Sequence, residues 1–199
     1  MAKGTKGFSD EERKELRKKL CLECQSHWAL YGYKKTNVRE LTAKIGISIG
    51  TFYLLYSSKE ELFCETLALV QSSLIASIRE IIAEEKGKIG FIKAMKWHFS
   101  EYEKFPFLYD LGSADFQAFV NRLSKEWIEK LKFNGVAFFY ETVALAELSF
   151  KVEKEQAYAV VSTLLYTVTA SEQPNNSKLD IFSFLLNSVV DQLFTESIK

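Results

Sequence analysis

Cysteine and histidine are the side chains of this chain that could bind a metal or carry redox chemistry. Cys21 and Cys24 are separated by two residues, the spacing found in zinc and thiol redox sites. His27 and Cys64 are the only plausible companions, and no second CxxC or HxxxH pair follows. Cys21 and Cys24 lie three apart within a helical stretch, and only Cys24 joins its apolar stripe, so we expect no metal site. We interpret the three cysteines as packing thiols in a reducing cytoplasm.

Catalytic motifs are also lacking. His27 and His98 lie far apart, and the sequence has no nucleophile elbow, phosphate-binding glycine loop or HExxH motif. Carboxylates such as Glu101 and Asp115 could pair in space, but their spacing does not predict it. We therefore expect a protein that binds other molecules, without enzymatic activity and without a cofactor.

The charge of the chain is unevenly distributed. Its 199 residues include 26 Lys+Arg and 26 Asp+Glu, which excludes a uniformly basic nucleic-acid coat. Residues 1–60, however, hold 12 Lys+Arg and 7 Asp+Glu, and residues 61–199 hold 14 and 19. A basic first third on an acidic remainder indicates a small polyanion-binding module attached to a larger body. Scatter among solvated charges is the alternative interpretation.

Composition favours a helical protein with a sizeable core. Hydrophobic residues make up 47% of the chain, and only 2 prolines and 9 glycines are present, which disfavours sandwiches, barrels and disorder. No apolar run reaches the length of a membrane span, and residues 1–9 lack the apolar region of a secretory signal. We expect a cytoplasmic protein that does not contact membranes.

Local signals place short helices in the basic first third. Ser9 with Glu12 predicts a capping box at the start of a helix that ends at Gly32. A short helix begins at Asn37 and ends at Gly46, and Ser48 caps a very short helix after a turn. A further capping box, Ser58-Lys59-Glu60-Glu61, begins a long helix. The region 37–56 therefore has the spacing of a helix-turn-helix, whose second helix enters the DNA major groove.

Several short motifs occur here in fixed register. They are Gly32-Tyr33, Thr36-Asn37-Val38-Arg39-Glu40-Leu41, Gly46-Ile47-Ser48-Ile49-Gly50-Thr51-Phe52-Tyr53 and Ser58-Lys59-Glu60-Glu61-Leu62. Together they closely resemble the N-terminal region of the TetR family of bacterial transcriptional regulators, over about residues 12–67. The rest of the chain is similar to the family in length and helical character only.

The resemblance implies which residues would contact DNA. Tyr53 matches a phosphate-contacting tyrosine of the recognition helix, and Lys59 matches a lysine that meets phosphate at the start of the fourth helix. Thr36 and Asn37 match positions that face the phosphodiester, and Gly50 matches a small residue that permits close approach. The side chains left nearest to base edges are Ser48, Ile49 and Thr51.

The sequence departs from the family pattern at two positions. Ile49 lies where the family often has Lys or Arg, which removes a possible guanine contact, and Leu55 replaces an aromatic residue. We therefore expect binding to depend on phosphate contacts. The alternatives are a core position for Tyr53, a purely solvated role for Lys59, and a helix-capping role alone for Thr36 and Asn37.

The last two thirds of the chain predict further helices. These cover 88–104, a long interrupted stretch over roughly 116–149, then 153–172 and 178–196, and Pro106 suits the first turn of a short segment. We predict an all-α fold. A three-helix helix-turn-helix domain (1–57) precedes a helical bundle that binds a ligand and dimerises (58–199).

Aromatic residues are concentrated in one window of this second part. Residues 91–140 contain 14 of the 28 aromatic side chains. Core packing accounts for any single ring, but rings that fit together poorly leave cavities suited to hydrophobic or cationic ligands. The candidate lining residues are Trp97, His98, Tyr102, Phe105, Phe116, Phe119, Trp127 and Phe138. Glu101, Asp110 and Glu141 could complement a cationic ligand.

The last helix is apolar over more than one stripe, so part of it must pack against something beyond its own domain. The resemblance implies a homodimer built from the final two helices. The candidate interface residues are Leu164, Val168, Phe182, Leu186, Val189 and Leu193.

The resulting prediction is a ligand-responsive transcriptional regulator, a repressor in our interpretation. It would bind a palindromic, double-stranded DNA operator as a homodimer and be released by a small hydrophobic or aromatic effector. An all-helical module that binds small molecules or proteins without binding DNA is the alternative.

Overall fold

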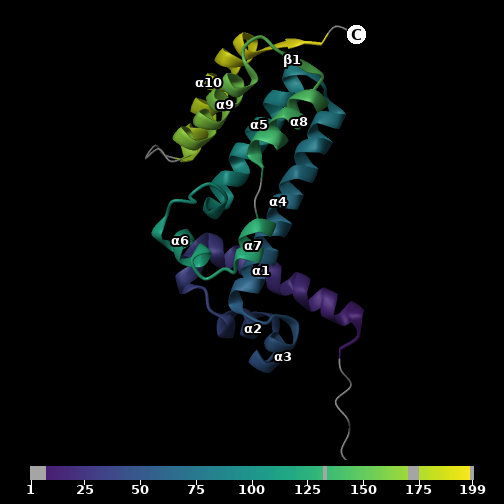
Figure 1. Cartoon of the computed structure of the whole chain (residues 1–199), viewed down its shortest axis with the longest axis vertical. Helices are drawn as coiled ribbons and strands as arrows, with labels where there is room; N and C mark the ends of the chain where they lie inside the picture. Colours follow the sequence, from purple (N-terminus) through teal and green to yellow (C-terminus); the bar gives the residue numbers. More distant parts are fainter. Residues whose placement is uncertain (1–7, 132–133, 170–174, 198–199) are drawn as a thin grey trace, which may run out of the picture. The chain divides into compact units, whose positions relative to one another are not determined.

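The computed structural model describes residues 8–131, 134–169 and 175–197, and these form an almost entirely helical chain (Figure 1). The chain divides into two compact units. Unit 1 comprises residues 1–70 and 110–131, and unit 2 comprises residues 71–109 and 132–199. The units follow a different division from the functional domains predicted at 1–57 and 58–199, because a segment from the middle of the chain packs with the N-terminal helices. The functional division stays a prediction.

Unit 1 begins with α1 (Asp10–Lys35), and its N-terminal capping box is confirmed. The hydroxyl of Ser9 accepts the Glu12 N–H at 3.2 Å, and the Glu12 carboxylate accepts the Ser9 N–H at 2.8 Å. Gly32, at φ 78° and ψ 172°, breaks the helical backbone near its end, as predicted. The last residues of α1 therefore turn in a new direction before α2 begins.

The predicted helix-turn-helix is present as α2 (Val38–Ile45) and α3 (Ile49–Leu55). Asn37 caps α2 by accepting the Glu40 N–H at 2.9 Å, and Ser48 caps α3 by accepting the Thr51 N–H at 3.0 Å. Gly46 ends α2 in the left-handed conformation, at φ 75° and ψ 30°, which is strained for residues with a side chain. Local capping chemistry thus fixes both ends of the turn.

The helix α4 (Lys59–Glu84) runs from unit 1 into unit 2. Its capping box forms only in part: Ser58 accepts the Glu61 N–H, but the Glu61 carboxylate binds Ser57 instead. Within the described part of the chain, α4 is the one helix long and apolar enough to cross a membrane, with a mean hydropathy of 1.4 over the window. Leu62 and Ile78 are completely buried, and about a third of the apolar window (33%) is buried.

The segment after α5 (Gly87–Lys104) differs from the prediction. Pro106 opens a single 3-10 turn, η1 (Pro106–Leu108), as expected. The helical stretch expected over roughly 116–149 is interrupted near Asn134-Gly135, as predicted, but the part before this interruption is not one helix. The stretch divides into α6 (Ala114–Val120), α7 (Lys125–Lys130) and α8 (Gly135–Leu145), with α6, α7 and α8 capped by Ser113, Ser124 and Asn134. Each cap starts a helix anew, so apolar periodicity alone overestimated helix length.

Unit 2 ends in a helix pair and a small sheet. The helices α9 (Lys154–Thr169) and α10 (Asn175–Leu193) pack side by side (Figure 1). The sequence did not predict the strands β1 (Leu148–Phe150) and β2 (Phe194–Glu196), which pair antiparallel with Ser149 opposite Thr195. The predicted last helix therefore ends at Leu193, three residues early.

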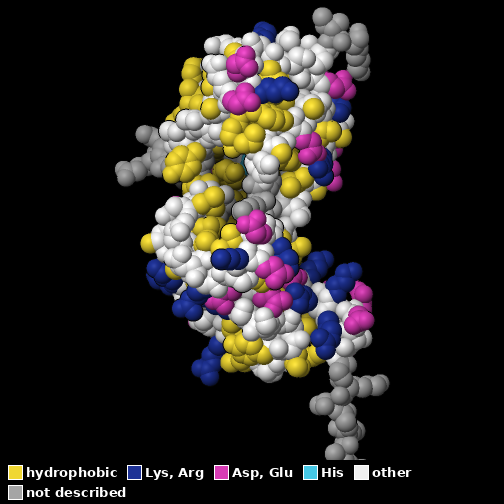
Figure 2. Space-filling view, viewed as in Figure 1, with side chains coloured by type: hydrophobic (Ala, Val, Ile, Leu, Met, Phe, Trp, Pro, Cys, Tyr) yellow, Lys and Arg dark blue, Asp and Glu magenta, His cyan; other side chains and the backbone are white. Residues whose placement is uncertain are grey.

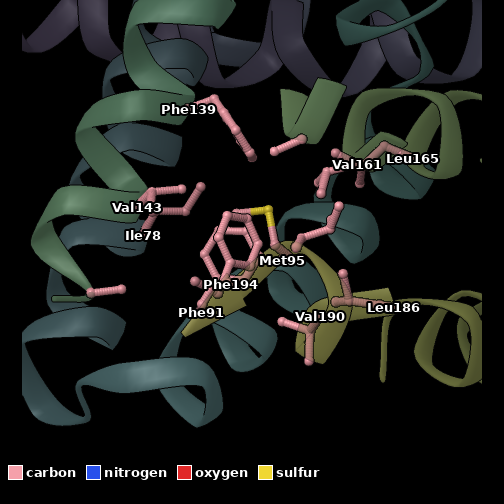
Figure 3. Packing of buried hydrophobic residues seen from close by; sticks show 14 of the residues in the cluster. Ile78, Phe91, Met95, Phe139, Val143, Val161, Leu165, Leu186, Val190 and Phe194 are labelled. Atoms are coloured by element: carbon pink, nitrogen blue, oxygen red, sulfur yellow. The ribbon is translucent and has the colours of Figure 1, made fainter. Parts of the chain in front are cut away.

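The core of unit 2 is built from α4, α5, α8, α9 and α10 (Figure 3). Phe91, Phe182 and Phe194 are completely buried, and Phe99 stacks on Phe182 with ring centroids 4.6 Å apart. The buried cluster reaches from α4 to β2, so the two short strands close one end of the same core.

Candidate functional site

The exposed face of the helix-turn-helix is formed by the N-terminus of α2 and by α3. Tyr53 is 58% exposed and packs edge-on against the buried ring of Phe52, so it is not a core residue. Ile49, Gly50 and Ser48 are exposed beside it. This face presents the phenol hydroxyl of Tyr53, the backbone at Gly50 and the aliphatic side chain of Ile49. Such groups suit phosphate contacts and thymine methyl contacts.

Four of the predicted DNA contacts, Thr36, Asn37, Ser48 and Thr51, are engaged in intramolecular hydrogen bonds. Thr36 is completely buried, and its hydroxyl donates to the Gly32 carbonyl at 2.8 Å. Asn37 and Ser48 are exposed but serve as helix caps, and the Thr51 hydroxyl lies 3.0 Å from that of Ser48. The buried Thr36 hydroxyl cannot reach a phosphate, so we leave Thr36 out of the proposed contacts. The other residues can cap a helix and face DNA at once.

Two arginines of α1 hold the C-terminal end of α3. Arg17 donates to the Leu55 carbonyl at 2.6 Å, and its guanidinium lies 4.2 Å from the ring centroid of Tyr56. Arg13 donates to the Leu54 carbonyl at 3.3 Å. Cations at this position are favourable, since the last carbonyls of a helix carry partial negative charge. α1 therefore fixes the position of the recognition helix.

Lys59 is turned inward. Its Nζ donates to the Tyr33 carbonyl at 2.5 Å and lies 4.1 Å from the Tyr33 ring centroid. Burial lowers the pKa of Lys59, and the neighbouring Glu60 carboxylate opposes that shift. An ammonium has three donors, so Lys59 can still offer N–H groups to an anion, but part of its charge is already satisfied.

A cavity in unit 2 lies between α5, α8 and α9 and has a volume of about 90 Å³. His98 and Tyr102 line it together, with ring centroids 4.5 Å apart. The Nδ1 atom of His98 is buried and has no hydrogen-bond partner. Burial lowers the pKa of His98 to about 4, so the ring is neutral at pH 7. The other lining residues are uncharged: Met95, Gly135, Phe138, Phe139, Thr142, Tyr158, Val161, Ser162 and Leu165.

The predicted ligand residues are divided between the two units. His98, Tyr102 and Phe138 line the cavity, whereas Trp97 packs against the unit 2 core and Phe105 lies beside Phe107. The rest belong to unit 1. There Phe116 and Phe119 pack against Trp28, and Trp127 lies under Lys130. We therefore leave Trp97, Phe105, Phe116, Phe119 and Trp127 out of the proposed pocket.

The predicted dimer residues lie mostly inside unit 2. Phe182 and Leu186 are completely buried, Val168 and Leu193 nearly so, and Leu164 and Val189 are half-buried. The outer face of the pair α9–α10 instead presents Tyr166, Ile181 and Phe184, which are 58%, 37% and 72% exposed. Apolar side chains gather over this helix pair on the face in view (Figure 2). The predicted interface residues of α10 thus lie mainly on its inner side, and its exposed apolar side chains lie on the outer side.

The three cysteines lie in unit 1 as free, buried thiols, and burial raises the pKa of Cys24 and of Cys64 to about 12. Within residues 8–131, 134–169 and 175–197, no three His, Cys, Asp or Glu side chains are grouped so that they could hold a metal ion.

Comparison with known proteins identifies the N-terminal region. Residues 27–66 match the family model for bacterial regulatory proteins of the tetR family. These residues are similar to the N-terminal region of that family. The resemblance noted in the sequence is thereby confirmed over this stretch. The comparison with curated proteins gives no match.

Solved structures extend the similarity to the whole fold. A TetR-family regulator from Pectobacterium atrosepticum is 15% identical, with a TM-score of 0.63, over 96% of this chain and 100% of that one. The TetR-family regulator CifR in complex with operator DNA is 18% identical, with a TM-score of 0.62, over 94% and 99%. FadR from Bacillus subtilis in complex with stearoyl-CoA is 16% identical, with a TM-score of 0.58, over 87% and 95%. The chain therefore has the all-helical fold of TetR-family transcriptional regulators.

Several residues that line the two candidate sites or lie beside them were not identified from the sequence. Leu54 of α3 is 62% exposed next to Tyr53, and its position was visible from helical spacing. Tyr158 and Ser162 of α9 line the cavity, but only the fold brings α9 to α5. Arg122 lies in a unit 1 groove with Tyr53, although about seventy residues separate them.

Proposed function

We propose that this protein is a ligand-responsive transcriptional repressor that binds a palindromic DNA operator as a homodimer. The observation that carries the proposal is the exposed face of α3. It presents Tyr53, Ile49 and Gly50 while α1 holds the helix from behind through Arg17. A rigid helix with an uncharged outer surface fits into a major groove without repulsion, and phosphate contacts around it provide affinity. The similarity to CifR, solved with operator DNA, supports this proposal.

A homodimer is proposed from the surface of α9 and α10. The sequence from Gln156 to Thr169 contains no charged residue, and neither does the stretch from Ile181 to Val190. On a monomer, Tyr166 and Phe184 would expose apolar surface that a soluble helix pair normally covers with charged side chains. A twofold partner that buries the same face on both copies removes this surface from water.

The effector is proposed to be a small, neutral and mainly apolar compound. The cavity lining has no charged side chain, so Glu101 and Glu141 do not serve a cationic ligand there; they pair with Lys104 and Arg79. The unpaired Nδ1 of His98 offers one hydrogen bond, which favours a ligand with a hydroxyl or carbonyl group. The relative FadR was solved with stearoyl-CoA, which supports ligand binding by this fold.

The size of the cavity indicates how an effector would act. Ligand pockets usually measure about 300–1,000 Å³, whereas this cavity measures about 90 Å³. A compound larger than a few heavy atoms must displace lining side chains such as Met95 or Phe139. Binding would therefore favour a different conformation of unit 2, and by linkage the effector and DNA would weaken each other's binding equally.

A mobility-shift assay tests the DNA-binding proposal. The full chain is mixed with a duplex from the region upstream of its own gene, at low salt. Tyr53→Phe should weaken binding about tenfold, since a hydrogen bond to a charged group contributes roughly 1.5–3 kcal/mol. Tyr31→Phe is the matched control, because Tyr31 is 54% exposed on α1, away from α3. If no duplex is bound, the alternative of a helical module without DNA binding is favoured. If the duplex is bound and both variants bind it alike, the Tyr53 hydroxyl makes no contact with DNA.

A further inference from the structure

A groove in unit 1 runs beside the recognition helix and carries several cations. Its lining comes from the end of α1, the starts of α2 and α4, α3, the turn before α4, and α6 with the residues that follow it. The polar lining residues are Tyr33, Lys34, Tyr53, Ser57, Ser58, Lys59, Glu60 and Arg122. Hydroxyls and cations in a concave surface next to Tyr53 are groups that bind phosphate.

The balance of charge in this groove is positive. Lys34 and Arg122 are exposed, and neither side chain has a hydrogen bond or ion pair with the described residues. Glu60 is the one carboxylate that lines the groove among these residues, and it accepts a hydrogen bond from the Tyr33 hydroxyl. Two exposed cations therefore remain uncompensated.

The third cation, Lys59, is partly engaged by the protein itself. Its ammonium donates to the Tyr33 carbonyl and lies over the Tyr33 ring. An anion in the groove must then be held mainly by the outer cations. Of these, a guanidinium can offer two parallel N–H groups to two phosphate oxygens, which an ammonium cannot do.

The helix that precedes Arg122 is fixed firmly to the helix-turn-helix. The Asp115 carboxylate of α6 accepts the N–H groups of Tyr33 at 2.5 Å and of Lys34 at 3.0 Å. Phe119 of α6 packs edge-on against Trp28 of α1, with centroids 5.2 Å apart. Arg122, one residue after α6 and its C-cap, therefore keeps a defined position relative to Tyr53.

We propose that Arg122 binds a backbone phosphate of the operator and extends the DNA contact surface beyond the helix-turn-helix. The inference rests on the proposed function, since it requires that the α3 face meets DNA. It assigns a DNA contact to a segment outside the N-terminal family match, which covers only residues 27–66. Tyr53 lines the same groove as Arg122, so a phosphate bound there would lie close to the phosphate that Tyr53 is proposed to contact.

The test measures how DNA affinity depends on salt. The probe is a duplex selected from a random-sequence pool on the immobilised full-length protein, and binding is followed by fluorescence anisotropy. Each phosphate contact contributes about 0.9 to the slope of log affinity against log salt. R122A should lower that slope by about 0.9 per bound chain. The ratio of the wild-type affinity for the duplex to that of R122A should then decrease three- to fourfold per chain between about 50 and 200 mM salt.

Two further variants separate a phosphate contact from a general loss of charge. Arg122→Lys should keep most of the salt dependence but bind more weakly than the wild type, because it lacks the planar fork. Lys125→Ala removes the same charge three residues away, at an exposed position outside the groove, and should leave the slope unchanged. Circular dichroism of all variants checks that the helices are retained.

The possible outcomes distinguish the two proposals. If the wild type selects no duplex, the proposed function fails. If the wild type binds but R122A and K125A have the same slope, the role of Arg122 is refuted while the proposed function stands. Calorimetry with inorganic phosphate tests whether the groove binds a free anion and not a phosphate of DNA. If phosphate binding is lost in R122A while the DNA slope is unchanged, the groove holds a free anion and the DNA assignment is overturned.

Discussion

Lowering the pH from 7 to 5 should destabilise the protein through His98. This ring is buried in an apolar cavity, and its Nδ1 atom has no partner that could stabilise a positive charge. Burial lowers its pKa to about 4, compared with about 6.5 in an unfolded chain. Between these two values the unfolded chain binds a proton that the folded protein does not. Stability is therefore complete above pH 6.5 and decreases as the pH falls toward 4.

The size of the effect follows from this difference. A shift of 2.5 pKa units corresponds to about 3.4 kcal/mol when the pH is below both values. At pH 5 most unfolded chains carry the proton and most folded ones do not, so about 2 kcal/mol of the total is already lost relative to pH 7. This loss is a substantial part of the stability of an ordinary domain.

Urea denaturation of the wild type and of His98→Phe, each at pH 7 and pH 5, measures this contribution. Phenylalanine has a similar shape and no ionisable group, and the adjacent cavity of about 90 Å³ can accommodate its extra volume. The wild type should lose about 2 kcal/mol more than the variant between the two pH values. Other titrating groups affect both proteins alike and cancel in the comparison. Protein concentration is kept constant, because the proposed dimerisation would also contribute to stability.

Equal losses in the two proteins would refute the reasoning. That result would mean that His98 becomes protonated without cost, for example because the cavity fills with water. An NMR titration gives an independent check, since the ring signals of His98 should not shift between pH 7 and pH 5. Saturation with a neutral effector that hydrogen-bonds His98 should steepen the pH dependence, because protonation would then also displace the ligand.

Three further changes test the fold and the assembly. Gly32→Ala places a Cβ 2.6 Å from the Asp115 carboxylate at a φ of +78° and should lower the free energy of unfolding by more than about 1–2 kcal/mol. Gly112→Ala is the control, because its Cβ would have no neighbouring atom within 4 Å, and it should leave the free energy of unfolding nearly unchanged. Ser48→Ala removes the α3 cap and should cost about 1 kcal/mol by the same assay; an unchanged midpoint would show that the cap is dispensable. Phe184→Lys should raise the dimer dissociation constant at least tenfold in sedimentation equilibrium, since both copies lose a buried ring; an unaltered mass distribution would exclude this face.

Features fixed by neighbouring residues could be predicted from the sequence. The caps at Ser9, Asn37 and Ser48 and the left-handed Gly46 were predicted because each depends on chemistry within about four residues. The helix-turn-helix followed from their spacing. These are also the positions that carry the family resemblance, because the turn admits few alternatives.

Features that depend on distant contacts could not be predicted. The β1–β2 pair joins Leu148 to Glu196, and each strand is only three residues long, so neither shows a recognisable alternation. α8 ends near Glu147, which adopts a positive φ of 56° without being glycine or asparagine. The sequence also could not assign the two apolar sides of α10. Only the packing shows that Phe182 faces the core and Phe184 faces outward.

The path of the chain shows how an effector in unit 2 could alter DNA binding. Residues 110–131 belong to unit 1 but are joined at both ends to unit 2, through η1 after α5 and through the start of α8. The cavity is lined by the end of α5 at Tyr102 and by the start of α8 at Gly135. A ligand that enlarges it would displace both attachment points of the segment that carries Asp115 and Arg122. This route is separate from α4, and it depends on the carboxylate that Gly32→Ala would displace. We therefore expect that variant to reduce the factor by which effector and DNA weaken each other's binding, and an unchanged factor would assign the coupling to α4 alone.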